Sequence, residues 1–195
     1  IVEIFLDAMD RIKSAASFMF VYPPRITRFA PSSGPSSGGT LVQLSGYNFV
    51  NTEQLVCRFG TIDVPGRWTS STSIQCVTPK TDTEETKSEV ALSLNGMDFS
   101  QSGFFYEWLE VSTLKAMAPT RGPSTGGTDV YIESDRFIFS SKLGCRFGLV
   151  DTPASFVNST HIRCTVPSLP TGVVSLSVTS NGVDYSDEPL QFEIE

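Results

Sequence analysis

Histidine and charged residues are scarce in this sequence of 195 residues. There is one His, and Asp, Glu, Lys and Arg together make up 18% of the chain, with a formal net charge of −7. A negatively charged molecule repels a phosphate backbone, so we expect no nucleic-acid partner. With a single His and no ligands clustered as in C-x2-C, we expect no zinc site either.

Long apolar runs are also absent. No stretch of the sequence reaches the roughly 18 to 20 apolar residues that cross a bilayer, so we expect no direct membrane insertion by this segment. Residues 1–6 lack the basic flank and the cleavage pattern of a signal peptide. Any anchor or targeting signal is therefore expected outside this segment.

An internal repeat at an offset of 88 residues organises the chain. Motifs recur at this spacing without a gap: PSSGPSSGGTLVQLSGYNF and PTRGPSTGGTDVYIESDRF at 31–49 and 119–137, and CRFG at 57–60 and 145–148. After Pro79 and its counterpart Pro167 the second copy is two residues shorter, which is typical of an exposed loop. The correspondence resumes at two Asn-Gly turns, Asn95-Gly96 and Asn181-Gly182.

The repeat predicts how the chain divides into domains. We expect complete domains over 22–108 and 109–195, and we interpret residues 1–21 as the C-terminal strands of a preceding repeat. Leu6 in that first segment lies 88 residues before Leu94. A helix is the alternative there, because DAMDRIKSAASF contains neither Gly nor Pro and is rich in Ala.

Within each repeat the apolar residues alternate in short runs, which is typical of half-buried strands. LVQL at 41–44 and VALSL at 90–94 are examples. Glycines separate the runs, and we expect Gly34, Gly38 and Gly39 to adopt the positive φ that only glycine reaches freely. About seven strands per repeat predict an all-β fold of tandem immunoglobulin-like antiparallel β-sandwiches.

Aromatic residues are expected in two places. Most belong to the two cores, together with aliphatic residues at matching positions: Phe49, Phe59, Trp68, Ile74 and Leu92, then Phe137, Phe147, Phe156, Ile162 and Val178. Phe104, Phe105, Tyr106 and Trp108 end the first repeat, and their apolar area is expected to contact the second repeat. The short connection at 109–113 contains neither Gly nor Pro, so the repeats should abut with little freedom.

The four cysteines occupy matching places in the two repeats. Cys57 and Cys76 are 19 residues apart, as are Cys145 and Cys164. Three pairings are formally open, and bonding within each repeat is the economical interpretation, because a bond between repeats must bring two domains within about 7 Å. Buried free thiols in a cytosolic protein are the alternative. Disulfides would indicate an oxidising, extracellular compartment.

Four motifs together indicate a family. They are the opening I-x-x-x-x-P-x-x-G-P-x-x-G-G-T at 26–40, CRFG, S-x-x-I-x-C-x-x-P at 71–79, and an N-G-x-D hairpin. Each repeat thereby resembles an IPT/TIG domain, the immunoglobulin-like module of plexins, Met-type receptors and Rel-type transcription factors. In extracellular members the resemblance implies the Cys57–Cys76 type of bond. Rel-type members bind DNA with a further domain and basic loops, and neither is visible here.

No catalytic or metal site is expected. We interpret His161 as a strand-surface residue, because a general base needs a positioned partner. Asp98 and Asp184 follow the Asn-Gly turns, and Asp63 and Asp151 precede a Pro. Turn capping is a sufficient role for these carboxylates, since calcium prefers about six to eight oxygen ligands. GPSSGG and GPSTGG lack the Lys of a phosphate loop, so we expect neither a cofactor nor enzyme activity.

Three surface residues are functional candidates. Arg58 and Arg146 each stand between an inward Cys and an inward Phe, so strand alternation places them outward, either on a solvated face or at a docking edge. Asn158 begins an N-S-T sequon, which makes it a candidate for glycosylation in an exported protein.

These features indicate a non-enzymatic structural or interaction segment of a secreted or cell-surface protein. Its expected partners are other protein chains or further repeats of the same chain, within a semi-rigid rod for display, adhesion or filament assembly. The alternative is a ligand-binding module, such as a carbohydrate-binding accessory domain of a receptor or extracellular enzyme. Against it, most aromatics occupy core positions of the alternating pattern.

Overall fold

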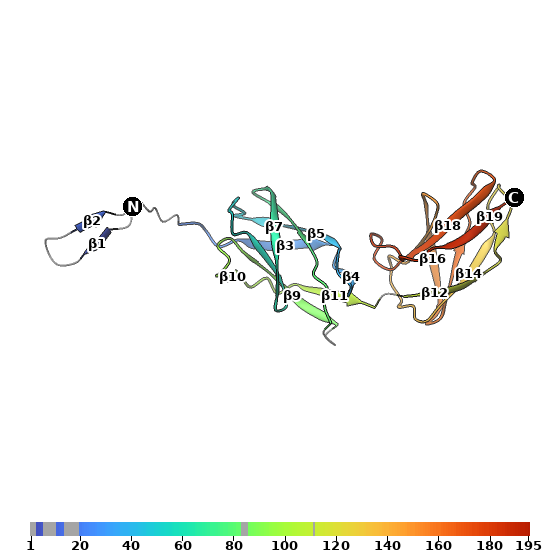
Figure 1. Cartoon of the computed structure of the whole chain (residues 1–195), viewed down its shortest axis with the longest axis horizontal. Coiled ribbons are helices and arrows are strands. Elements are labelled where there is room, and N and C mark those ends of the chain that lie inside the picture. The colour runs from blue at the N-terminus through green and yellow to red at the C-terminus, as the bar shows by residue number, and fades with distance from the viewer. Residues whose placement is uncertain (1–2, 6–10, 14–19, 83–85, 111) are drawn as a thin grey trace.

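The computed structural model describes residues 3–5, 11–13, 20–82, 86–110 and 112–195. Figure 1 shows two β-sandwiches arranged end to end, with a small pair of strands before the first. All regular elements in these ranges are strands, and no helix that could span a membrane is found among them.

The first repeat forms a 9-stranded arrangement in two layers. Its strands are β3 (Arg25–Ala30), β4 (Ser33–Pro35), β5 (Leu41–Tyr47), β6 (Val56–Phe59), β7 (Ile62–Ser70), β8 (Ser73–Val77), β9 (Lys87–Ser93), β10 (Phe99–Ser100) and β11 (Phe105–Leu109). One layer holds β3, β5 and β8, and the other holds β6, β9, β10, β11 and β4. The long strand β7 pairs first with β6 and then with β8, so it passes from one layer to the other.

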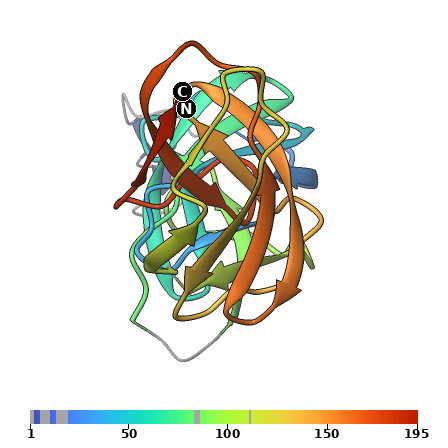
Figure 2. The ribbon, with the colours of Figure 1, turned by 90° about the vertical axis from the view of Figure 1, so that its right-hand side faces the viewer.

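The second repeat has the same order in 8 strands. They are β12 (Leu114–Ala118), β13 (Arg121–Gly122), β14 (Asp129–Ser134), β15 (Gly144–Phe147), β16 (Val150–Asn158), β17 (His161–Thr165), β18 (Gly172–Thr179) and β19 (Leu190–Ile194). Strand β16 crosses between the layers as β7 does. Figure 2 looks onto this repeat along the long axis of the molecule. The predicted class, tandem antiparallel β-sandwiches, is confirmed.

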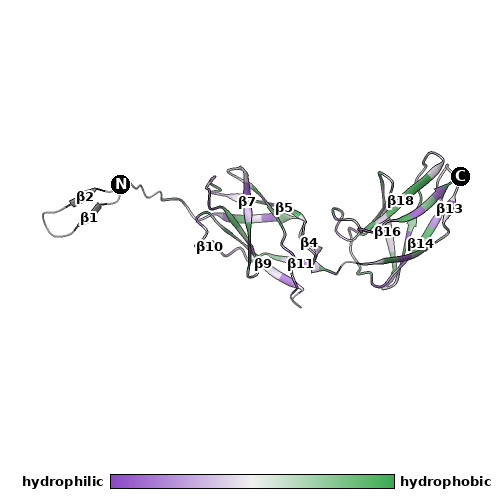
Figure 3. Cartoon of the chain, viewed as in Figure 1, coloured by the Kyte–Doolittle hydropathy of each residue, from purple (hydrophilic) through white to green (hydrophobic). Residues whose placement is uncertain are grey.

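Each repeat has its own core and its own cross-linked cysteines. Cys57 on β6 is bonded to Cys76 on β8, and Cys145 on β15 is bonded to Cys164 on β17, with Cα atoms 6.3 Å apart in both pairs. Each bond therefore joins the two layers of one sandwich. The apolar positions alternate along the strands (Figure 3), and the predicted core residues are buried except Trp68 and Phe156. Trp68 and Phe156 pack half-buried at the margins of the cores.

The aromatic residues that end the first repeat do not join it to the second, so that expectation is wrong. Tyr106 and Trp108 are buried in the first core, and Phe104 packs against that core. Phe105 is 57% exposed. Alternation along β11 turns positions 106 and 108 inward, so their apolar area is already buried within the repeat.

The N-terminal segment contains β1 (Glu3–Phe5) and β2 (Arg11–Lys13). They pair antiparallel, with Ile4 opposite Ile12. Where the segment is described it is therefore strand and not helix. Leu6 and the remaining residues of 1–19 lie outside the described residues, and the assignment of 1–21 to a preceding repeat stays a prediction.

Candidate functional site: the joint between the repeats

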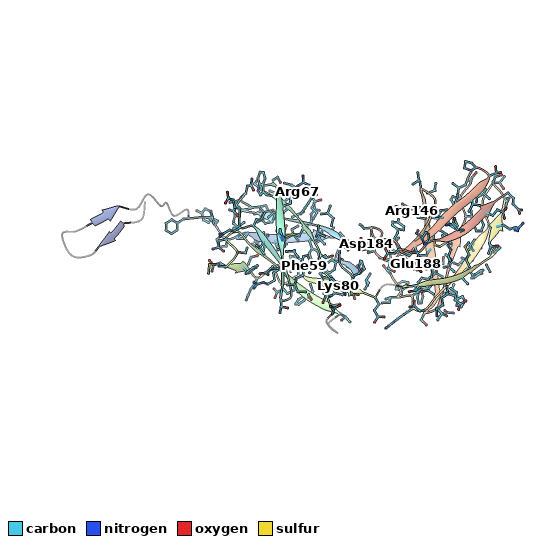
Figure 4. All side chains as sticks on the ribbon, in the orientation of Figure 1. Phe59, Arg67, Lys80, Arg146, Asp184 and Glu188 are labelled. Carbon is cyan, nitrogen blue, oxygen red and sulfur yellow. A yellow bond between two sulfur atoms is a disulfide. The ribbon has the colours of Figure 1, made fainter. Side chains whose placement is uncertain are left out.

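An Asn-Gly-x-Asp turn follows β18 at the end of the second repeat that faces the first (Figure 4, where Asp184 is labelled). The Asn181 Oδ1 accepts hydrogen bonds from the N–H groups of Val183 and Asp184, at 3.0 and 2.8 Å. Its Nδ2 donates to the Asp184 Oδ2 at 2.6 Å, and Gly182 has a φ of 77°. One side chain therefore shapes the turn and fixes the carboxylate. We call residues 181–184 the second NGxD turn, and residues 95–98 the first.

The second NGxD turn reaches into the first repeat beside β4. The Asn181 Nδ2 donates to the Ser33 carbonyl oxygen at 2.8 Å, and the Thr40 Oγ1 donates to the Asp184 Oδ2 at 2.7 Å. A Cβ on Gly34 would lie 3.1 Å from that carboxylate and closer still to the Thr40 hydroxyl. We call Ser33, Gly34 and Thr40 the first niche, because the missing side chain at Gly34 leaves room for the carboxylate.

Gly34 is needed for space and not for a turn. Gly38 and Gly39 have φ values of 77° and 90°, as expected, but Gly34 does not have a positive φ. It lies in β4, which runs parallel to β11 with Gly34 opposite Trp108. The expectation that Gly34 adopts a positive φ is therefore wrong. Glycine is needed at this position because a side chain would collide with the Thr40 and Tyr106 hydroxyls.

The Tyr106 hydroxyl also reaches the first niche, from the side of the core of the first repeat. Its ring lies in the core against Phe59, with centroids 5.5 Å apart. Burial raises the pKa of Tyr106 to about 12; the Thr40 hydroxyl lowers it in part, and the Asp184 carboxylate raises it. The Thr40 proton is directed to Asp184, and the Tyr106 Oη has no hydrogen-bond partner among the described residues. The phenol is therefore neutral at physiological pH and borders the half-buried Asp184 carboxylate.

The connection at 109–113 is tied to both repeats. The Leu109 carbonyl oxygen accepts a bond from the Ser36 N–H of the first repeat at 2.9 Å. Glu110 forms an ion pair of 2.7 Å with the Arg136 side chain of the second repeat. An exposed ion pair alone contributes little to stability. The hydrogen bond and the ion pair nevertheless shorten the part of the connection that can change conformation.

The joint is open and polar, with a cleft of about 340 Å³ beside the second NGxD turn. Both repeats and the connection line this cleft, among them Pro35, Gly39, Leu109, Val178 and Asp187. The repeats are therefore held by a few directed hydrogen bonds and not by a large apolar interface.

The model of the IPT/TIG domain matches residues 24–106 and 112–194. The chain belongs to the IPT/TIG family. The matched ranges lie inside the predicted domains 22–108 and 109–195, whose outer limits stay a prediction.

Plexins and fibrocystin-L are among the proteins that are similar to this chain. Plexin-2 of Caenorhabditis briggsae is 28% identical over 181 residues, which is 87% of this chain and 10% of that protein. Human fibrocystin-L is 28% identical over 158 residues, which is 80% of this chain and 4% of that protein. A structure of the plexin A4 extracellular region, domains 1 to 10, has the same fold, with a TM-score of 0.57 and 20% identity over 98% of this chain and 17% of that one.

The chain thus spans a tenth or less of the length of plexin-2 and fibrocystin-L. Together with the two disulfides, the similarities place this TIG pair outside the cell or at its surface. They also place it among the interaction and structural segments of cell-surface proteins.

Arg58 points outward from the first TIG repeat, as predicted, and is paired. Its Nε and Nη2 donate to the two carboxylate oxygens of Asp63 at 2.6 and 3.0 Å, and its guanidinium lies 3.4 Å from the centre of the Phe99 ring. The hydrogen bonds from Arg58 lower the pKa of Asp63. We expected Asp63 to cap a turn, and this is wrong. It pairs with Arg58 instead, because β6 and β7 place the two residues directly opposite each other.

The second TIG repeat has the same arrangement with one more contact. Arg146 binds both oxygens of Asp151 at 2.7 and 3.0 Å and lies 3.7 Å from the centre of the Tyr185 ring. The Tyr185 hydroxyl donates to Asp151 at 2.9 Å. Tyr185 directly follows Asp184, just as Phe99 follows Asp98 in the first repeat. In both TIG repeats the arginine therefore braces the residue next to the NGxD turn.

Asn158 is exposed at the end of β16. Its Oδ1 accepts bonds from the Thr160 N–H and hydroxyl, both at 2.9 Å, and the Thr160 Oγ1 lies 2.9 Å from the His161 Nδ1. Among the residues described, no three His, Cys, Asp or Glu side chains gather around a common point. Glycosylation of Asn158 stays a prediction.

Sequence reasoning missed the role of Ser33, Gly34 and Thr40. The signal was available in part, because Gly34 and Thr40 recur as Gly122 and Thr128. What the sequence could not supply was the distance between this motif and the N-G-x-D motif of the next repeat.

Proposed function

We propose that this TIG pair is a non-enzymatic, semi-rigid spacer for display, adhesion or filament assembly at the cell surface. The observation that carries the proposal is the Asp184 carboxylate, held between the Thr40 hydroxyl and the Asn181 amide at the joint. Asn181 is only 8% exposed. Its partners would be other protein chains or further repeats of the same chain, as for the extracellular segments it resembles.

A few hydrogen bonds are sufficient to hold the two repeats at a fixed angle, because the repeats are already joined covalently by the connection. A hydrogen bond to a charged group contributes about 1.5 to 3 kcal/mol, and a neutral one about 1 kcal/mol. The short connection removes most of the cost of bringing two bodies together. A net gain of about 2 kcal/mol would keep the docked form in roughly thirtyfold excess.

The described surface favours a spacer over a sugar-binding module. Four of the aromatic side chains that are about half exposed or more lie on separate elements: Tyr47 on β5, Phe105 on β11, Tyr131 on β14, and Phe139 in the loop after β14. Phe20 and Tyr22 are also exposed and lie together in the segment before β3. Phe20 lines a cleft with Phe99, but the Phe99 ring is already covered by the Arg58 guanidinium. A stacking platform for a sugar needs neighbouring rings in one cleft. The joint, by contrast, gathers its polar groups at one place.

Small-angle scattering and residual dipolar couplings on the two-repeat chain test this proposal. The intact chain should behave as one elongated body with a fixed angle between the repeats. Asn181→Ala removes the bond to Ser33 and releases the carboxylate, so the distance distribution should broaden.

Asn95→Ala is the matched control, because Asn95 makes the same bonds within the first NGxD turn, and none of its hydrogen bonds to described residues reaches the second repeat. It should leave the angle between the repeats unchanged. Independent motion of the repeats in the unaltered chain, or a compact side-by-side pair, would refute the spacer.

A further inference from the structure

A second copy of the niche lies at the far end of the second repeat. Arg121, Gly122 and Thr128 stand at the positions of Ser33, Gly34 and Thr40, and we call them the second niche. Strand β13 runs parallel to β19 as β4 runs parallel to β11. Figure 3 shows β13 beside the C-terminus, away from the first repeat.

The second niche leaves the same space as the first. A Cβ on Gly122 would lie 2.6 Å from the Thr128 Oγ1 and 3.2 Å from the Phe192 ring. The covering differs: Thr40 is fully buried, whereas Thr128 is partly exposed. The hydroxyl that would donate to a carboxylate is thus open to solvent at this end.

The chain also leaves both repeats along the same path. In the first repeat the Ser36 N–H donates to the Leu109 carbonyl oxygen at 2.9 Å, at the first residue of the connection. In the second repeat the Ser124 N–H donates to the Glu195 carbonyl oxygen at 2.8 Å. A connection of the same length after Glu195 would therefore bring a following repeat to the second niche.

We propose that the second niche binds the NGxD turn of a further TIG repeat that follows on the same chain. The proposal rests on the proposed function, because it extends the same joint by one repeat. The aspartate of the incoming turn accepts a bond from the Thr128 hydroxyl, and its asparagine donates to the Arg121 carbonyl oxygen. Arg121 stands where the first niche has Ser33, and its guanidinium is already paired with Glu195 at 2.9 Å and Glu193 at 3.6 Å. The attraction for the incoming carboxylate therefore comes from the Thr128 hydroxyl.

The core beneath the second niche suits this role. Phe192 occupies the position of Tyr106, so an incoming carboxylate would border a ring without a hydroxyl. No buried hydroxyl then needs a partner, and that removes one desolvation cost from docking. The Thr128 hydroxyl and the backbone provide the polar contacts.

The test uses the chain with residues 110–195 repeated directly after Glu195, which preserves the spacing of the natural connection. Residual dipolar couplings and scattering then report the order at both joints of one molecule. The added repeat should adopt the same angle to its neighbour as the second repeat has to the first.

Thr128→Val and Thr40→Val separate the two joints, since Val keeps the shape of Thr and lacks its hydroxyl. In the three-repeat chain Thr128→Val should lower the ratio of docked to undocked forms at the new joint about tenfold. The same change in the two-repeat chain should leave its joint unaltered. Thr40→Val should loosen only the original joint, and thermal unfolding checks that both variants fold.

Free movement of the added repeat beside an ordered original joint would overturn this inference and leave the proposed function standing. An ordered new joint that is indifferent to Thr128→Val would also overturn it. Disorder at both joints would overturn the proposed function together with the inference.

Discussion

The two NGxD turns have the same internal hydrogen bonds and different surroundings. Asn95 and Asn181 each accept bonds from two backbone N–H groups at 3.0 and 2.8 Å, and each donates to the aspartate three residues later. Only Asn181 is buried at a joint, whereas Asn95 and Asp98 are exposed. The turn is therefore shaped within its own repeat, and docking orders little that was not ordered before.

The two niches differ in what lies beneath them. Tyr106 brings a hydroxyl to the first niche, and Phe192 brings none to the second. The threonine and the glycine are common to both. This comparison indicates that the space and the threonine hydroxyl make the joint, and that the tyrosine hydroxyl is an addition of the first repeat.

Loss of a disulfide should have the largest effect and should not distinguish the repeats. Each bond closes a loop with a sequence separation of 19, so replacing either cysteine pair by Ala should cost its own repeat about 3 kcal/mol of unfolding free energy. Calorimetry of the two double variants measures this, and non-reducing peptide mapping checks the pairing. Free thiols, or a bond between repeats, would contradict it.

A valine in place of the niche glycine should loosen the joint between the repeats in the first niche, but not in the second. Gly34→Val places a side chain against the Thr40 and Tyr106 hydroxyls and the Asp184 carboxylate, so it should cost about 1 to 3 kcal/mol and free the repeats. Gly122→Val should strain its own repeat and leave the joint intact. Chemical unfolding combined with scattering distinguishes these results. Equal loosening of the joint by both variants would show that the first niche has no special role.

Tyr106→Phe should have a small effect at neutral pH, below about 1 kcal/mol, because the hydroxyl it removes has no hydrogen-bond partner among the described residues. Since burial raises the pKa of Tyr106 to about 12 from 10.0, the first repeat should lose stability as pH rises through that interval. The variant should lose less over the same interval. Unfolding at several alkaline pH values measures the difference, and a large loss at neutral pH would indicate a bond to Asp184.

Glycosylation should distinguish the repeats without changing their stability. Asn158 is exposed, and the matching position in the first repeat is Ser70, which cannot carry an N-glycan. In protein secreted from eukaryotic cells, mass spectrometry before and after glycosidase treatment should show one glycan, absent from Asn158→Gln. An unmodified Asn158 in such material would contradict the prediction.

The fold could be predicted from the sequence because its main signals are local and repeated. The alternation of strands and the recurrence of CRFG are both visible in the letters alone. The joint could not be predicted, since Asp98 and Asp184 both end an N-G-x-D motif and only Asp184 is bonded to a threonine of another repeat. Asp63 was misassigned for a similar reason, because its partner Arg58 lies across a strand pair.

The disulfides set a limit on how far each repeat can lengthen when the chain is pulled. A fully extended residue spans about 3.3 to 3.6 Å, so a bond that encloses a sequence separation of 19 withholds roughly 65 Å of length. The strands outside the loop, such as β3 and β11, can peel away under load while the bonded segment keeps its two ends together. A TIG pair stretched between two cells would therefore yield in short steps and remain a shorter tether than its residue count implies.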